Sequence, residues 1–147
     1  ARLAQLPNVV AVKMPLPDGD DFAGELAAIR AATPASFKVG YSGDWGCTAA
    51  LLAGGDTWYS VIAGLLPVET LALAQASLDG DSVKAGQLNA AFAPLWALFK
   101  EFGSFRVMFV IAELLDLGRF APPLPILPLD DDARTRIKAA LDGLQVQ

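Results

Sequence analysis

One lysine is placed where it could act as a nucleophile. Lys13 lies at the end of VVAVKM, a short β-branched run typical of a strand, and turn-forming residues follow it. In parallel α/β folds, the carboxyl ends of the strands face the ligand site. Burial there favours the neutral amine, which can attack a carbonyl and form an imine. The alternative interpretation is a lysine that extends from a strand end into solvent.

Two further runs end in groups that could bind or orient a small molecule. In GYSGD, Gly40 would allow a ligand to approach the backbone, while Asp44 could simply cap the next helix. Tyr59 and Ser60 lie in a third β-rich run, where a phenol could orient a substrate or relay a proton. An aromatic residue in a strand is more often core packing, so the residues alone leave both interpretations open.

Other chemistries are restricted by what the chain lacks. It contains no histidine and one cysteine, Cys47, so it can form neither an intrachain disulfide nor a cysteine-based metal cluster. The acidic residues near positions 18–21 and 130–132 are interpreted as compensating helix N-termini, because a metal site would need converging ligands from elsewhere. Any acid/base chemistry must use lysine, tyrosine or carboxylate groups.

Composition excludes several classes of partner. A net charge of -5 over 147 residues, with scattered Lys and Arg, argues against nucleic acid and anionic membranes as partners. No apolar run approaches the ~20 residues that span a bilayer, and the N-terminal residues lack a signal-peptide pattern. We therefore predict a cytoplasmic protein. Its 54% hydrophobic content is high for a small domain and predicts that further protein covers some of its surface.

The first half of the chain alternates short strands with helical stretches. The predicted strands are Val9 to Met14, Phe37 to Ser42 and Thr57 to Gly64, with helical patterns between them. This alternation predicts an α/β fold with a parallel sheet. The strands are nearly continuous in apolar character, which predicts that protein covers both faces of the sheet.

The second half is predicted to be helical. Pro67 and Gly80 suit the start and stop of one helix, and a second runs from Ser82 to about Gly103. An apolar segment over residues 105–117, a proline-rich connector and an amphipathic helix opened by Asp130 complete the chain. We predict β-α units over residues 1–80 and a three-helix domain over residues 81–147.

Four of these runs together resemble a known family. LAQLPNVVAVK, FKVGYSGD and LAGGDTWYSVIAGLLP are similar to the sixth, seventh and eighth strand segments of the dihydrodipicolinate synthase / N-acetylneuraminate lyase family. LPLDDDARTRIKAAL resembles the family's closing Leu-Pro-Leu and last helix. The motifs occur in order and cover essentially the whole chain, which is far more specific than one lysine.

The resemblance implies both a fold and a chemistry. It implies the last three β-α units of a TIM (β/α)8 barrel followed by a C-terminal helical domain, hence the C-terminal half of a class I lyase or aldolase. Lys13 would be the Schiff-base lysine acting on pyruvate or another 2-oxo acid, and Gly43 and Tyr59 would line the substrate pocket. The resemblance implies neither a metal nor an organic cofactor, and it suggests a homo-oligomer, often a tetramer.

The chain departs from the family pattern near the expected pocket. Met14 stands where an acidic or small polar residue is usual, Tyr59 replaces a branched aliphatic residue, and Gly64 replaces an asparagine. GSFR over residues 103–106 replaces the usual Asn-Pro turn. These differences predict an altered pocket and leave open the second substrate and whether a bond is made or broken.

Essential partners of the lysine are expected upstream of residue 1. The family binds the pyruvate carboxylate after its second strand and relays protons through a tyrosine on its fifth, so we predict little or no turnover from this chain alone. The rival interpretation is a non-catalytic half-barrel that binds a small anion or acts as an assembly module, with Lys13 merely exposed. An independent flavodoxin-like domain is disfavoured, because no phosphate-binding glycine loop follows any strand.

Overall fold

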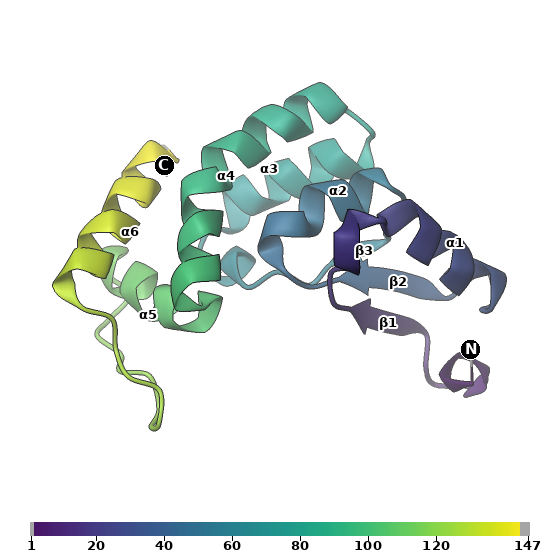
Figure 1. The fold of residues 1–147 in the computed structure, drawn as a ribbon, viewed down its shortest axis with the longest axis horizontal. Coiled ribbons are helices and arrows are strands. Elements are labelled where there is room, and N and C mark those ends of the chain that lie inside the picture. The colour runs from purple at the N-terminus through teal and green to yellow at the C-terminus, as the bar shows by residue number, and fades with distance from the viewer. Residues whose placement is uncertain (1, 145–147) are drawn as a thin grey trace. The chain divides into compact units, whose positions relative to one another are not determined.

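The fold combines a small parallel sheet with a series of helices, as the computed structural model of the chain shows for residues 2–144 (Figure 1). The strands are β1 (Ala11–Met14), β2 (Lys38–Tyr41) and β3 (Thr57–Trp58). The helices are α1 (Phe22–Ala31), α2 (Cys47–Leu52), α3 (Pro67–Leu78), α4 (Ser82–Phe102), α5 (Ser104–Leu114) and α6 (Asp131–Gly143). Short 3-10 helices lie at Leu3–Gln5, Asp18–Asp20, Asp44–Gly46 and Ile62–Gly64.

The chain forms two compact units. The first comprises the described residues up to Ser60 together with Ala72–Gly86, and the second comprises Val61–Leu71 together with the described residues from Gln87 onward. Helices α3 and α4 each contribute residues to both units. The predicted domain boundary after residue 80 remains a prediction.

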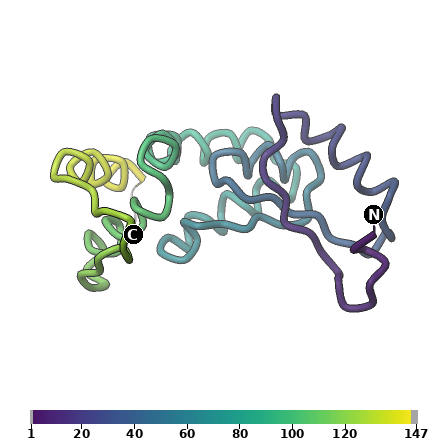
Figure 2. Tube along the Cα trace, turned by 60° about the horizontal axis from the view of Figure 1, so that its bottom comes forward, coloured from purple at the N-terminus to yellow at the C-terminus, as the bar shows by residue number. Residues whose placement is uncertain are grey.

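The sheet is parallel, in the order β1-β2-β3. Val12 pairs with Val39 and Lys13 with Gly40, and in the next pair of strands Gly40 aligns with Thr57. Figure 2 follows this arrangement as a trace, with the purple first strand beside the blue second one. The predicted α/β fold with a parallel sheet is confirmed.

Helices α1 and α2 pack on the same face of the sheet. The core of this unit joins the strand residues Val39 and Tyr41 to Phe22 and Leu26 of α1 and to Ala50 of α2. The Phe22 and Tyr41 rings meet edge to face, with centroids 5.3 Å apart. Since strand side chains alternate between faces, the intervening residues of β1 and β2 belong to the opposite face.

Helix α1 is capped at its N-terminus by Asp21. The side chain of Asp21 accepts a hydrogen bond of 2.9 Å from the backbone N–H of Gly24, which satisfies one of the exposed donors at the helix N-terminus. Glu25 in the first turn and Arg30 in the last complement the helix dipole. Because α1 connects the end of β1 to the start of β2 across one face of the sheet, the two strands can lie parallel.

The third strand is much shorter than predicted. The run Thr57 to Gly64 was expected to be one strand, but β3 ends at Trp58 and a 3-10 helix forms at Ile62–Gly64. Ile62 is fully buried in that helix, so its apolar character reflects packing rather than strand pairing. A short apolar run does not by itself distinguish a strand from another buried segment.

Asp56, which directly precedes β3, forms hydrogen bonds with residues of β2 and α1. Its carboxylate accepts hydrogen bonds from the Val39 N–H (2.8 Å), from Arg30 (3.0 Å) and from Lys38 (3.1 Å). Burial alone would raise the pKa of Asp56, but the Val39 hydrogen bond and the two cations outweigh it and hold this pKa below its usual range. The carboxylate therefore stabilises the folded chain in its ionised form.

We expect Asp56→Asn to lower the free energy of unfolding by about 1–3 kcal/mol near neutral pH, because it removes the charge that two cations and a strand N–H share. Since the folded-state pKa of Asp56 is lowered, this contribution is present above the unfolded-state pKa and is lost as the pH falls through the folded-state pKa. Urea unfolding from about pH 7 to about pH 3 should show the difference between the two proteins shrinking.

The matched control is Asp142→Asn, which removes an exposed carboxylate paired with Lys138 four residues before it on α6. This exposed pair should contribute little at any pH. An Asp56→Asn protein as stable as the unmodified chain near neutral pH would contradict the role given to Asp56.

The second unit contains the last helices. Helix α5 buries Val107, Val110 and Ile111, and α6 buries Ile137 and Leu141. The Asp130 side chain caps α6 by accepting a hydrogen bond of 2.9 Å from the Ala133 N–H, which confirms the predicted role of this acidic run. No helix among residues 2–144 is both long enough and apolar enough to cross a bilayer.

Candidate functional site

Lys13 lies on the sheet face opposite helices α1 and α2. Its neighbours Val12 and Met14 pack against the helix-covered core, while the Lys13 side chain is exposed. It is the third of the four residues of β1, so it stands close to the carboxyl edge of the sheet. The expectation that protein covers both faces is therefore not met at Lys13 within the described chain.

Tyr59 lies on the same face as Lys13. Gly40 is the direct partner of Lys13 in β2, and aligned residues of neighbouring strands point to the same side. A Cβ atom built on Gly40 would lie 2.7 Å from Cε2 of Tyr59 and 2.8 Å from Cβ of Thr57. The Tyr59 ring therefore covers Gly40, next to the strand position of Lys13.

Gly40 has a different role from the one its sequence suggests. The sequence suggests a point where a ligand could approach the backbone, but the space that the missing side chain leaves is taken by Tyr59 and Thr57. The Tyr59 N–H also donates a hydrogen bond of 2.8 Å to the Tyr41 carbonyl, which extends the pairing of β2 and β3. Tyr59 is thus held by both its backbone and its ring.

Gly43 lies in the loop after β2, at the carboxyl edge of the sheet. Its φ of +98° is one that residues with a Cβ rarely adopt, and a Cβ there would lie 2.9 Å from the Leu16 side chain. The loop is joined to the end of β1, since the Ser42 N–H and hydroxyl both donate to the Met14 carbonyl, at 2.9 and 3.2 Å. Gly43 can therefore contribute to a site through its backbone.

Asp44 ties this loop to the third strand. Its side chain is 1% exposed, and its Oδ1 accepts a hydrogen bond of 3.0 Å from the indole N–H of Trp58. Asp44 also opens the 3-10 helix that leads into α2. The loops that follow β1 and β2 and the end of β3 are thus bound to one another around the carboxyl edge.

Two other reactive side chains belong to the helix-covered side of this unit. Burial raises the pKa of the Tyr41 hydroxyl, and the neighbouring Glu25 carboxylate raises it further. Burial also raises the pKa of the Cys47 thiol, to about 12. Both groups are protonated at neutral pH, so neither is suited to act as a base or nucleophile, and Cys47 packs in the interior as predicted.

The structure brings some predicted site residues together and adds others. Lys13 and Tyr59 share a face of the sheet, and Gly43 lies at its carboxyl edge, facing Leu16. Sequence reasoning missed Asp56; its position directly after two glycines, just before a strand, was the available signal. Within residues 2–144, no group of three or more Cys, Asp or Glu residues is placed to hold a metal ion.

Lys13 thus lies near the carboxyl edge of a parallel sheet, on the face that also carries Tyr59. The sequence model of the dihydrodipicolinate synthetase family matches residues 1–144. The chain belongs to this family, which confirms the resemblance found in its motifs.

Individual relatives agree with the family model. The 4-hydroxy-tetrahydrodipicolinate synthase of Synechococcus elongatus is 36% identical over 146 residues, which cover 98% of this chain and 47% of the relative. The crystal structure of dihydrodipicolinate synthase from Agrobacterium tumefaciens is 56% identical, with a TM-score of 0.96, over 98% of this chain and 48% of that one. The chain thus spans about half the length of the relatives it matches.

A more distant structure shows the same fold. The dihydrodipicolinate synthase of Acinetobacter baumannii, solved in complex with pyruvate, matches with a TM-score of 0.80 at 21% identity. The match covers 99% of this chain and 49% of the Acinetobacter chain.

Proposed function

We propose that this chain is the C-terminal half of a lysine-dependent carbon–carbon lyase or aldolase that acts on pyruvate or another 2-oxo acid. Residues 1–80 would supply the last three β-α units of a TIM barrel, and residues 81–147 would form the C-terminal helical domain. One observation carries the proposal. Lys13 lies near the carboxyl edge of a parallel sheet, on the face that also holds Tyr59.

The proposed reaction begins with Lys13. The neutral amine of Lys13 attacks C2 of the 2-oxo acid, and the carbonyl oxygen leaves as water, which gives an imine. The protonated imine draws electrons from the neighbouring carbon, so a proton at C3 is lost and an enamine forms. Bond formation to an aldehyde, or the reverse cleavage, would take place at C3.

Tyr59 and Gly43 would shape the pocket around this imine. The phenol of Tyr59, held over Gly40, would orient the substrate or relay a proton, and the backbone at Gly43 would line the site. The pyruvate complex of the Acinetobacter baumannii relative supports pyruvate as the substrate class. No metal or organic cofactor is required for these steps.

Because Lys13 is exposed in this chain, we expect a further protein segment to cover it in the active enzyme. The proposed reaction needs a site from which water is excluded, so protein must cover this face of the sheet. The half of the relatives that this chain does not match would supply that cover, together with the groups that bind the carboxylate. The complete enzyme would form a homo-oligomer, often a tetramer in this family, and the cytoplasmic location stays a prediction.

We expect the 147-residue chain alone to show no turnover above background, because groups that act as one catalytic unit fail together. A single chain in which the unmatched part of the Agrobacterium tumefaciens enzyme precedes residue 1 should restore the chemistry; we call this protein the chimera. The readout is exchange of the pyruvate methyl hydrogens in D2O, followed by NMR, which reports the enamine without a second substrate.

The two proteins separate the proposal from its rival. A non-catalytic half-barrel that binds a small anion or serves as an assembly module would give no exchange in either protein. Exchange by the folded chimera and none by the isolated chain would support the proposal. Exchange at equal rates in both would contradict the need for an upstream half.

A further inference from the structure

The loop that follows β2 carries Gly43, whose backbone would line the proposed pocket. Gly43 has no side chain, so what it can offer a substrate depends entirely on where its backbone lies. Its φ of +98° is in a region that glycine enters readily, and glycine also leaves this region readily for others. The position of Gly43 is therefore set by the residues on either side of it.

The first strand holds one side of this loop. The Ser42 N–H and hydroxyl both donate to the Met14 carbonyl, at 2.9 and 3.2 Å. The Leu16 side chain, in the segment after β1, lies against Gly43 and Gly46, because a Cβ atom built on either glycine would come within 2.9 or 2.6 Å of it. These contacts tie the loop to the end of β1.

A hydrogen bond between two side chains holds the other side of the loop. Asp44 directly follows Gly43, and its Oδ1 accepts a bond of 3.0 Å from the indole N–H of Trp58. Trp58 is the last residue of β3 and aligns with Tyr41, the last residue of β2. The bond therefore joins the loop to the end of the neighbouring strand.

Burial makes this hydrogen bond important for the position of the loop. The Asp44 residue is 1% exposed, so water does not replace a donor that its carboxylate loses. Hydrogen bonds to carboxylates are also stronger than those between neutral groups. Loss of the Trp58 N–H would thus favour a shift of the loop that brings the carboxylate to water or to another donor.

Trp58 acts from the side of the sheet opposite to Lys13. Aligned residues of neighbouring strands point to the same side, and Tyr41, the partner of Trp58, belongs to the helix-covered core. Lys13 belongs to the other face. Trp58 would therefore influence a substrate on Lys13 through the loop and not by contact.

We propose that Trp58 and Asp44 are positioning residues for the Lys13 site, an inference that rests on the proposed function. Their hydrogen bond holds the backbone at Gly43 where it contacts the bound 2-oxo acid. The contacts of Ser42 and Leu16 fix the loop relative to β1, and the Trp58 bond fixes it relative to β3.

The test is Trp58→Phe in the chimera, since phenylalanine keeps an aromatic ring but has no N–H for Asp44. We expect the KM for pyruvate in the methyl-exchange assay to rise by about tenfold, with kcat within about threefold, because the contact at Gly43 holds the substrate and makes no bond change. A variant that merely lowered the folded fraction would lower kcat and leave KM unchanged. Borohydride trapping on Lys13 should persist at saturating pyruvate.

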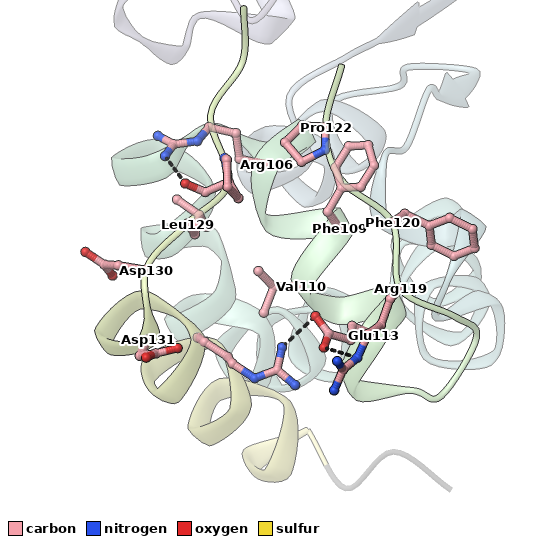
Figure 3. A pocket seen from close by; sticks show the side chains of 12 residues that line it. Arg106, Phe109, Val110, Glu113, Arg119, Phe120, Pro122, Leu129, Asp130 and Asp131 are labelled. Carbon is pink, nitrogen blue, oxygen red and sulfur yellow. Dashed lines mark hydrogen bonds and ion pairs between the residues drawn. The ribbon is translucent and has the colours of Figure 1, made fainter. Parts of the chain in front are cut away.

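Two control variants lose stabilising contacts elsewhere. Asp56→Asn weakens the link between β2 and the start of β3, at the amino edge of the sheet. Glu113→Gln breaks the ion pairs with Arg134 and Arg119 in the second unit, which Figure 3 marks with dashed lines. Both controls should keep the KM within about twofold of the unmodified chimera, because changes at independent sites do not couple.

A double variant tests the pair itself. In a chimera that already carries Asp44→Ala, Trp58→Phe should change KM by no more than about twofold, because the acceptor is gone. If Asp44→Ala does not fold, the KM of Trp58→Phe against its two controls decides. An unchanged KM in Trp58→Phe, or an equal rise in Asp56→Asn, would overturn the inference and leave the proposed function standing. A folded, unmodified chimera without exchange would overturn both.

Discussion

Lys13→Arg is expected to abolish pyruvate methyl exchange in the chimera. Arginine keeps a positive charge and a long side chain at this position, but its guanidinium cannot form the imine. We therefore expect the exchange rate to fall by at least about a thousandfold, since the nucleophile takes part in every later step. Exchange measured by NMR in D2O, with circular dichroism to confirm folding, gives the result.

Lys38→Arg is the matched control. Lys38 also lies in a strand of the same sheet, but it pairs with Asp56 at the start of β2, away from the carboxyl edge. Arginine can keep this pair, so the exchange rate should stay within about twofold of the unmodified chimera. A chimera with Lys13→Arg that still exchanges at the unmodified rate would exclude Lys13 as the nucleophile.

Gly40→Ala is expected to destabilise the folded chain by forcing β2 and β3 apart. The new Cβ would lie 2.6 Å from the Thr57 carbonyl oxygen and 2.7 Å from the Tyr59 ring, closer than such atoms can approach. Backbone atoms cannot move aside as a flexible side chain can, so β2 and β3 must separate or shift. We expect the free energy of unfolding to fall by about 2–4 kcal/mol in denaturant titrations.

Gly86→Ala supplies the comparison for this change. Gly86 lies inside α4 and its added Cβ would meet nothing within 4 Å, so the same substitution should stabilise the chain by up to about 1 kcal/mol. Opposite signs for the two alanine variants would support the contacts assigned to Gly40. A Gly40→Ala protein of unchanged stability would show that Tyr59 does not occupy the space above Gly40.

The periodic part of the fold could be predicted from the sequence. Short runs rich in β-branched and aromatic residues located the first two strands, and capping residues such as Asp21 and Asp130 located the helix starts, because these signals act within a few residues. The end of β3 could not be predicted, since Ile62 is buried in a 3-10 helix rather than a strand. Burial alone does not determine local backbone geometry.

The candidate site was only partly predictable for a different reason. The position of Lys13 follows from the strand that precedes it, but its closeness to Tyr59 depends on the register of β1 on β2 and on the glycine at position 40. Register is set by contacts between segments far apart in sequence, so one chain read alone does not give it. For the same reason, the contacts of Asp56 with β2 could not be predicted from the sequence.

Borohydride trapping of the chimera in the presence of pyruvate, with the modified peptide identified by mass spectrometry, tests directly whether Lys13 forms an imine. Borohydride delivers hydride to C2 of the imine and converts it to a stable secondary amine, which marks the lysine that formed it. We expect one reduced pyruvyl adduct, on Lys13, and none in the Lys13→Arg protein. A folded chimera that gives no adduct, or gives one only on another lysine, would contradict the proposed Schiff-base mechanism.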